Sequence, residues 1–174
     1  VAGQDTHGNL LQDLLDSNGI DKSGVVISRD RSTITKMRIL GDRQQMMRLD
    51  FETVRDVEQQ EEEELISWLD SLCQKGLDGI VISDYGKGVC TDSILEKIFN
   101  LANCYKIPTI VDPKGSQWEK YNGATYITPN VKELSERVGY SITNDDDKIV
   151  TAAKEVLATN NIQYIIATRS EKGI

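Results

Sequence analysis

The amino-acid sequence predicts an α/β fold: a mostly parallel sheet flanked by helices, with a small β-hairpin. The first observation is that short apolar runs alternate with amphipathic segments from residue 80 onwards, the pattern of successive β–α–β units. The second is that these runs end in polar turns containing glycine and lysine, such as residues 84–88. The third is a pair of polar, β-branched stretches around Gly41 and Asp42, which is typical of a hairpin.

The N-terminal part predicts a helix followed by the hairpin. Leucines at helical spacing in residues 10–15, followed by Asn18 and Gly19, indicate a helix whose leucine face packs in the core. Residues 25–53 are too polar for the centre of a parallel sheet, so we expect them to project as a lid. The alternation places residues on two faces, with Thr33, Thr35, Met37 and Ile39 on one and Ile34, Lys36, Arg38 and Leu40 on the other.

The rest of the chain predicts alternating helices and strands. Residues 57–74 form a helix whose glutamate-rich start suits the positive end of the helix dipole. Four strands follow, each ending in a polar turn, and helices lie between them. Because parallel strands place their carboxyl ends at one edge of a sheet, these turns are expected to share one site. They are residues 84–88, 112–115, 128–130 and 168–173.

The four turns carry Lys87, Lys114, Arg169 and Lys172, which form a basic rim in an acidic protein of net charge −8. Such a rim favours phosphorylated ligands. For residues 84–88 alone, an ordinary β–α turn with a solvated lysine is an equally good interpretation. The sequence contains neither a G-x-x-x-x-G-K-[ST] loop nor a G-x-G-x-x-G fingerprint.

Composition excludes several other classes of function. The 28 acidic residues against 20 basic ones argue against broad nucleic-acid binding. No apolar run approaches the ~20 residues of a membrane span. His7 is the only histidine, which disfavours a His-based triad or a multi-histidine metal site. Three cysteines without a metal-ligand spacing predict reduced thiols in the cytoplasm.

With these turns and the hairpin, the sequence resembles the ribokinase-like (PfkB) carbohydrate kinases. Within them it resembles the D-glycero-β-D-manno-heptose-7-phosphate kinases of ADP-heptose synthesis. The Thr-Pro-Asn-x-x-Glu element at residues 128–133 is similar to the wider family, while the hairpin and residues 168–173 resemble the heptose branch. The similarity covers nearly the whole chain. Its other matching segments are residues 33–38, 44–52, 83–88, 112–115 and 121–125.

A two-stranded hairpin is marginal by itself, and its unpaired edges and apolar face need cover, so we expect the lid to help form a homodimer. The resemblance implies a kinase that uses ATP and Mg²⁺ to phosphorylate heptose 7-phosphate at position 1. It implies neither a nucleic-acid nor a membrane partner. The implied sugar or phosphate contacts are Lys36, Arg38, Gln45, Arg48, Asp84, Lys87, Asp112 and Lys114. The implied nucleotide-binding residues are Asn130, Glu133, Thr168, Arg169, Ser170, Lys172 and Gly173, with Glu133 also holding Mg²⁺ through water.

Two segments of the family pattern do not occur in the sequence. The Gly-Gly-x-x-x-Asn substrate segment is expected before Val1, and the Gly-Ala-Gly-Asp segment with the catalytic base is expected after Ile174. Residues 1–174 are therefore expected to form a single incomplete ribokinase-like domain without a catalytic residue of its own. Two other functions stay open: another PfkB-type sugar kinase, and a non-catalytic module that binds nucleotide or sugar phosphate.

For several of these residues, an ordinary structural role without a ligand also stays open. Lys36 and Arg48 fit exposed strand positions, and Asp50 is expected to pair with Arg38 across the hairpin if it has no ligand role. Glu133 fits the first turn of an ordinary helix. Ser170 stands where many relatives of the resembled family have glycine.

Overall fold

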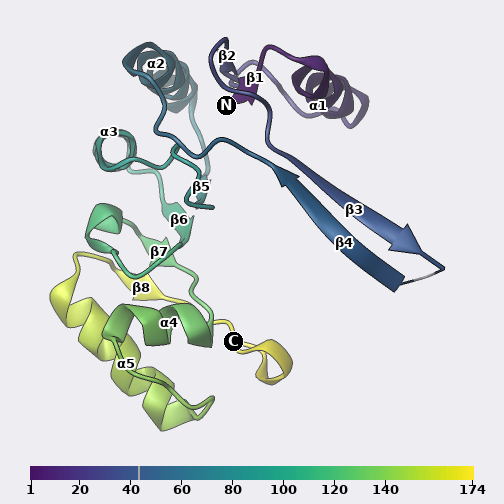
Figure 1. Ribbon diagram of the computed structural model, residues 1–174. Helices are drawn as coiled ribbons and strands as arrows, with labels where there is room; N and C mark the ends of the chain where they lie inside the picture. The colour runs from purple at the N-terminus through teal and green to yellow at the C-terminus, as the bar shows by residue number, and fades with distance from the viewer. Residues whose placement is uncertain (43) are drawn as a thin grey trace. The chain divides into compact units, whose positions relative to one another are not determined.

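The computed structural model describes residues 1–42 and 44–174, which divide into two compact units, Val1–Trp68 and Leu69–Ile174 (Figure 1). The boundary falls inside helix α2 (Gln59–Lys75), which confirms the helix expected at residues 57–74. Of the helices in these two ranges, none is both long enough and apolar enough to cross a membrane.

The first unit contains one complete helix, a short parallel strand pair and the hairpin. Asp5 caps the helix by accepting the Gly8 N–H at 2.7 Å, and its other carboxylate oxygen accepts the Thr33 N–H at 2.7 Å. One aspartate therefore joins the start of the helix to the segment that enters the hairpin. The elements are β1 (Ala2–Gly3), α1 (Thr6–Ser17), β2 (Ile27–Ser28), β3 (Thr35–Gly41) and β4 (Gln44–Phe51).

The leucine face of α1 is not buried in this unit. Leu10 and Leu14 are 54% and 52% exposed, so the expectation that the leucines pack in the core is wrong. The helix instead approaches β1 closely through Gly8, where an added Cβ would collide with the carbonyl oxygen of Gly3. Because α1 contacts β1 through Gly8, the leucine face is not the face that packs against β1.

The hairpin is confirmed, and its register separates two chemically different faces. Thr35 lies opposite Phe51, Met37 opposite Leu49 and Ile39 opposite Met47, so one face is apolar. Lys36 lies opposite Asp50 and Arg38 opposite Arg48, so the other face is charged. A register shift between Ile39 and Leu40 follows. We call these the apolar and the charged face of the hairpin.

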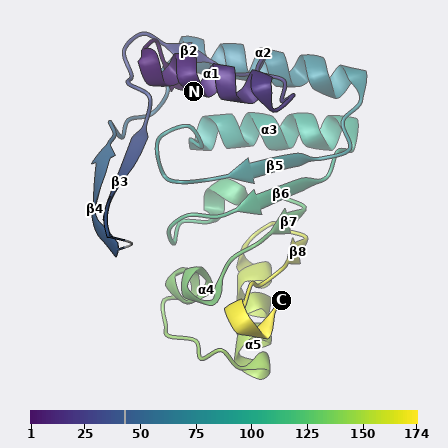
Figure 2. The same cartoon turned by 90° about the vertical axis from the view of Figure 1, so that its right-hand side faces the viewer.

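The second unit is built on a parallel sheet in the order β5-β6-β7-β8, as Figure 2 shows. Sequential strands are therefore neighbours, which confirms the β–α–β interpretation. The elements are β5 (Ile80–Ser83), α3 (Asp92–Tyr105), β6 (Thr109–Asp112), η1 (Glu119–Tyr121), β7 (Tyr126–Ile127), α4 (Val131–Val138), α5 (Asp146–Thr159), β8 (Tyr164–Ile165) and η2 (Ser170–Lys172).

This strand order leaves one face of the sheet bare within the second unit. Each crossover steps in the same direction, so right-handed connections bring the helices of this unit to the other face. On this helix-covered face Ile82, Val111 and Ile127 are 5%, 0% and 0% exposed. The opposite face carries a row of paired residues across all four strands, of which Val81 and Tyr164 are 73% and 55% exposed. The row is Val81, Ile110, Tyr126 and Tyr164.

Two threonines extend the short pairing between β6 and β7. The Thr109 N–H donates to the Thr125 hydroxyl at 3.0 Å, and the Thr125 N–H donates to the Thr109 hydroxyl at 2.9 Å. Only two ladder pairs follow them. The two threonine hydroxyls thus accept hydrogen bonds from two backbone N–H groups just before the first backbone pair, Ile110 with Tyr126.

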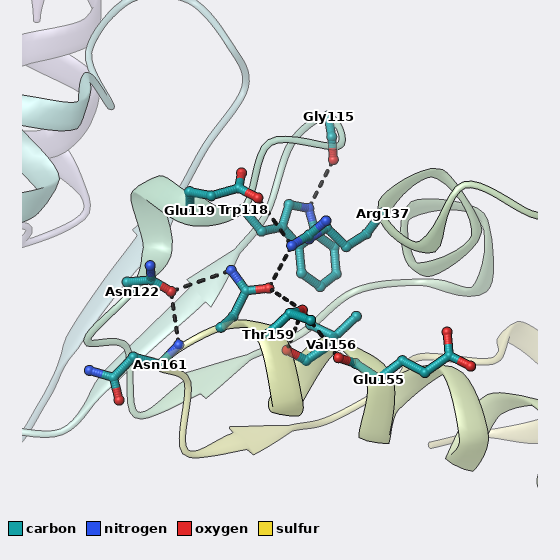
Figure 3. Close-up of polar contacts among 10 residues, drawn as sticks. Gly115, Trp118, Glu119, Asn122, Arg137, Glu155, Val156, Thr159 and Asn161 are labelled. Atoms are coloured by element: carbon teal, nitrogen blue, oxygen red, sulfur yellow. Dashed lines mark hydrogen bonds and ion pairs between the residues drawn. The ribbon is translucent and has the colours of Figure 1, made fainter.

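Arg137 of α4 connects three parts of the second unit (Figure 3). Its guanidinium donates to Glu119 at 3.1 Å and to the side chain of Asn160 at 2.8 Å. Asn160, at the end of α5, donates in turn to the Asn122 side chain at 3.3 Å. This network fixes α4 and α5 against the loop around η1, and thereby holds the helix whose N-terminus enters the candidate site.

Candidate functional site

The four polar turns lie at the same edge of the sheet, as the sequence predicts. Ser83 pairs with Asp112, and the next residue, Asp84, donates its N–H to the Asp112 carbonyl at 3.0 Å. At the other end of this edge, Asn130 and Thr168 form a parallel bridge. The carboxyl ends of all four strands therefore point to one side, where open α/β sheets bind their ligands.

Asp84 begins the turn after β5 (residues 84–88, the β5 turn) and is 4% exposed. One carboxylate oxygen accepts the Gly86 N–H at 2.6 Å. The other accepts the Lys120 ammonium at 2.6 Å and the Tyr121 hydroxyl at 2.7 Å. The carboxylate is thus saturated by the protein itself, and the structure places Asp84 inside the wall of the site instead of on its surface.

The protonation states of this cluster follow from burial and charge. Burial opposes ionisation of Asp84, but hydrogen bonds from Lys120, Gly86 and Tyr121 outweigh it and lower its pKa. Burial raises the pKa of the Tyr121 hydroxyl, and the Asp84 carboxylate raises it further, so the hydroxyl keeps its proton and donates it. Burial and then the Asp84 charge raise the pKa of the nearby Cys90 thiol to about 11, which makes this thiol a poor nucleophile.

The turn after β6 (residues 112–115, the β6 turn) is held by two aromatic residues that are 0% exposed. The Lys114 N–H donates to the Tyr121 hydroxyl at 3.0 Å, and the Trp118 indole donates to the Gly115 carbonyl at 2.9 Å. The side chain of Lys114 is exposed and, in residues 1–42 and 44–174, has no ion-pair partner. A Cβ added to Gly86 would lie 3.6 Å from Lys114 Cγ, so the β5 and β6 turns are neighbours.

Asn130 and Glu133 form a reciprocal cap at the start of α4. The Glu133 N–H donates to the Asn130 side chain at 2.9 Å, and the Asn130 N–H donates to Glu133 Oε2 at 2.9 Å. Both residues therefore have a helix-capping role, as the ordinary interpretation of Glu133 expects. Within residues 1–42 and 44–174, Oε2 is the one Glu133 oxygen that accepts a hydrogen bond, and the other oxygen of this carboxylate could hold Mg²⁺ through water.

The turn after β8 (residues 168–173, the β8 turn) is fastened by Asn144. Arg169 Nε donates to the Asn144 side chain at 2.9 Å, the Asn144 amide donates to the Arg169 carbonyl at 3.2 Å, and Lys172 donates to the Asn144 carbonyl at 2.5 Å. Arg169 also pairs with Asp146 at 2.7 Å. Arg169 and Lys172, which were expected in the basic rim, are thus engaged by the protein.

Ser170 adopts a left-handed backbone with φ +54°. Residues with a Cβ atom are sterically disfavoured in this left-handed region, whereas glycine is not. The conformation explains why glycine suits this position in the family that the sequence resembles.

The hairpin residues expected to bind sugar or phosphate lie in the first unit. Lys36 pairs with Asp50 at 3.0 Å, and Arg48 makes two hydrogen bonds to Asp50, at 2.8 and 3.1 Å. The expected pairing of Asp50 with Arg38 is therefore wrong, because its cross-strand neighbour Lys36 and Arg48 on its own strand occupy it. The Arg38 side chain has no hydrogen-bond or ion-pair partner in the described ranges, and Gln45 is exposed.

Sequence reasoning missed four residues that hold the turns by direct hydrogen bonds: Trp118, Lys120, Tyr121 and Asn144. The one available signal was the run from Tyr121 to Thr125, which matches the resembled family without an evident role. A cavity of 690 Å³ beside α4 is lined by none of the predicted site residues; Lys132, Glu136 and Tyr140 are among those that line it. The candidate site is therefore an open edge, distinct from this cavity.

The fold is that of an α/β protein with a parallel sheet, and its polar turns gather at the carboxyl ends of the strands. Among solved structures, the tetrameric inhibited form of phosphofructokinase-2 from Escherichia coli superposes with a TM-score of 0.69 at 20% identity, over 96% of this chain and 54% of that chain. At that level of identity the likeness concerns the fold. The family model described as pfkB family carbohydrate kinase matches residues 1–174, and the chain belongs to that family.

The chain is also similar to curated proteins named Bifunctional protein HldE, among them those from the following two organisms. The protein from Mesorhizobium japonicum is 37% identical over 174 residues, which is 100% of this chain and 35% of the relative. The protein from Geobacter sulfurreducens is 36% identical over 174 residues, again 100% of this chain and 35% of the relative. The chain thus spans about a third of the length of these relatives.

Proposed function

We propose that the protein containing this chain is a cytoplasmic, ATP-dependent kinase that phosphorylates D-glycero-β-D-manno-heptose 7-phosphate at position 1. The observation that carries the proposal is the convergence of four polar turns on one sheet edge in a pfkB-family carbohydrate kinase. The similarity to HldE proteins and the charged hairpin face support the heptose branch.

In this proposal the lysines of the edge bind the phosphorylated sugar. Lys114 is exposed and unpaired in the described ranges, and Lys87 lies on the neighbouring β5 turn. Arg38 lies opposite Arg48 on the hairpin, and Arg48 already pairs with Asp50 at 2.8 Å. Arg38 is therefore the cation of this pair that is proposed to contact an anion. The roles of Gln45 and Asp112 in sugar binding remain part of the proposal.

The proposed nucleotide side comprises α4 and the β8 turn. Glu133 would hold Mg²⁺ through water, and Asn130 orients that carboxylate through the reciprocal cap. When bound, Mg²⁺ neutralises charge on the transferring phosphoryl group. The left-handed Ser170 and the Arg169–Asn144 hydrogen bonds set the backbone of residues 168–173, which would line the nucleotide.

The test measures how fast the complete gene product phosphorylates each of three sugars with ATP: heptose 7-phosphate, fructose 6-phosphate and ribose. We expect kcat/KM for heptose 7-phosphate to exceed the others by roughly 10²-fold or more, because sites built to bind a polar group reject substrates that lack it. A preference for fructose 6-phosphate or ribose would indicate another pfkB-type sugar kinase. Binding without turnover would indicate a non-catalytic module.

Lys114→Met tests the basic rim. We expect the KM for the sugar phosphate to rise about 10- to 100-fold, as for loss of a hydrogen bond between charged groups. The matched control is Lys154→Met, which removes an exposed lysine of α5. Equal KM values for the two variants would contradict the proposed role of Lys114.

We also propose that the apolar face of the hairpin forms a homodimer with the same face of a second copy. Met47 and Phe51 on this face are 49% and 55% exposed, and a two-stranded hairpin needs cover to be stable. Met47→Asp is expected to shift sedimentation of the complete gene product from dimer to monomer, whereas Gln45→Asp, near the hairpin tip, is not. An unchanged dimer in Met47→Asp would refute the interface.

The catalytic base is proposed to lie outside residues 1–174, since the Gly-Ala-Gly-Asp segment does not occur in them. A positioned base typically contributes ~10²–10⁴-fold to rate. We therefore expect the 174-residue chain to consume ATP with heptose 7-phosphate at least ~10²-fold more slowly than the complete gene product. Equal turnover would place the base within the chain.

A further inference from the structure

Tyr121 joins two turns that come from different strands. Its hydroxyl donates to Asp84 of the β5 turn at 2.7 Å and accepts the Lys114 N–H of the β6 turn at 3.0 Å. The ring is 0% exposed, so water does not compete for either hydrogen bond. The Tyr121 oxygen therefore links the Asp84 carboxylate to the backbone of Lys114, beyond the point where the β5–β6 backbone pairing ends at Asp84 and Asp112.

The neighbours of Tyr121 make this spacing rigid. Asp84 fixes the β5 turn through the Gly86 N–H, and Trp118 fixes the β6 turn through the Gly115 carbonyl. The Lys120 ammonium lies 2.6 Å from Asp84 and 5.1 Å from the centre of the Tyr121 ring. Backbone donors and acceptors on both turns are thus tied to buried side chains.

The same cluster balances charge in a way that serves an anionic ligand. Asp84 lies on the same turn as Lys87, and Lys120 pairs with Asp84 at 2.6 Å in the wall of the site. The exposed ammonium of Lys114 stays unpaired in the described ranges. The buried pair keeps the carboxylate from competing with a phosphate for that cation.

We propose that Tyr121 is a positioning residue for substrate: with Lys120 and Asp84, it holds the β5 and β6 turns at the spacing at which Lys87 and Lys114 bind one phosphorylated sugar. This inference rests on the proposed function and adds to it a specificity role for a residue that does not touch the ligand. It predicts that the hydroxyl controls sugar-phosphate affinity and has little effect on the nucleotide.

Tyr121→Phe in the complete gene product is the first test, because it removes one oxygen and keeps the ring in the core. We expect the KM for heptose 7-phosphate to rise roughly threefold to tenfold, as for loss of one hydrogen bond. The KM for ATP and kcat should stay within about twofold. The matched control is Tyr140→Phe, which also loses a hydroxyl bond to a carboxylate, that of Glu155 at 3.0 Å, away from these turns.

Lys120 variants separate positioning from general stability. Lys120→Arg keeps the charge opposite Asp84 and is expected to retain a near wild-type KM for heptose 7-phosphate. Lys120→Met leaves Asp84 without its cation and is expected to raise that KM at least as much as Tyr121→Phe. Equal KM values for Lys120→Arg and Lys120→Met would overturn the charge-balancing role.

Amide hydrogen exchange tests the positioning independently of any activity. In Tyr121→Phe the Lys114 amide loses its acceptor, so its exchange should quicken, while exchange in the core of α3 should not change. If the wild type phosphorylates no sugar but this exchange pattern appears, the proposed function fails and the positioning of the turns stands. Unchanged Lys114 exchange, or an unchanged sugar KM in an active enzyme, overturns the inference.

Discussion

The β3–β4 hairpin and the β5–β8 sheet both alternate two kinds of side chain, yet different interactions stabilise them. In the sheet, helices of the same unit cover one face, and Val111 and Ile127 are 0% exposed. In the hairpin, Ile39 and Met47 of the apolar face are 36% and 49% exposed. The charged face of the hairpin is held by ion pairs in solvent, whereas the sheet edge has an ion pair between Asp84 and Lys120 in its wall.

This difference shows where stability and binding reside. Burial of apolar side chains stabilises the sheet, and that in turn fixes the turns at its edge. Cross-strand pairs in the hairpin each contribute only about 0.2–1 kcal/mol. Its side chains are therefore available for a ligand or a partner, and substitutions there should alter binding before they alter folding.

The largest expected effect is in the sheet core. Ile127→Ala should lower the free energy of unfolding by about 2–5 kcal/mol, because it removes buried methyl groups and leaves a cavity. Ile39→Ala on the hairpin is the counterpart; in a Met47→Asp background, where the proposed dimer interface is broken, it should change the free energy of unfolding by less than about 0.5 kcal/mol. Urea unfolding at one protein concentration compares the two. Similar losses would show that the apolar face of the hairpin is as well covered as the core.

An intermediate effect is expected at the buried ion pair. Asp84→Asn should cost about 1–3 kcal/mol of unfolding free energy at pH 7, because Lys120 loses its charged partner. The folded-state pKa of Asp84 is lowered, so its contribution is present above about pH 4 and is lost as the pH falls through the folded pKa. Unfolding at a series of pH values should therefore show wild type and variant converging below about pH 4. Asp13→Asn, an exposed change on α1, is the matched control and should change the free energy of unfolding at pH 7 by less than about 0.5 kcal/mol.

The smallest effect is expected at the exposed ion pair of the hairpin. Lys36→Met removes the partner of Asp50, but Arg48 still bonds that carboxylate twice and solvent reaches the pair. We expect no measurable change in the thermal unfolding midpoint. A clear drop in the midpoint would show that the charged face is buried in solution and would remove the contrast with the sheet.

The parts of the fold that follow from local pattern were predictable. Alternation identified the hairpin faces, and β–α–β order placed Asp84, Asp112, Asn130 and Thr168 at one edge. A helical spacing of leucines also predicted α1, but Leu10 and Leu14 are exposed because periodicity shows that a face is apolar without showing what covers it.

The interactions that hold the site were not predictable from the sequence. Lys120 and Tyr121 are 36 and 37 residues from Asp84, and nothing in their immediate surroundings marks them as its partners. The same holds for Asn144, which contacts Arg169 at a separation of 25 residues. Resemblance supplied candidate roles for the exposed cations, whereas the buried groups that orient them depend on tertiary packing.

The reciprocal hydrogen bonds between Thr109 and Thr125 have a consequence for folding fidelity. β6 and β7 share only two backbone pairs, so competing alignments of such short strands differ little in backbone energy. A slip of one residue would separate both hydroxyls from their N–H partners and leave buried donors unsatisfied near Thr109, which is 1% exposed. The two threonines thus penalise misaligned intermediates during assembly of the sheet, and valine, of similar shape, would lose this discrimination.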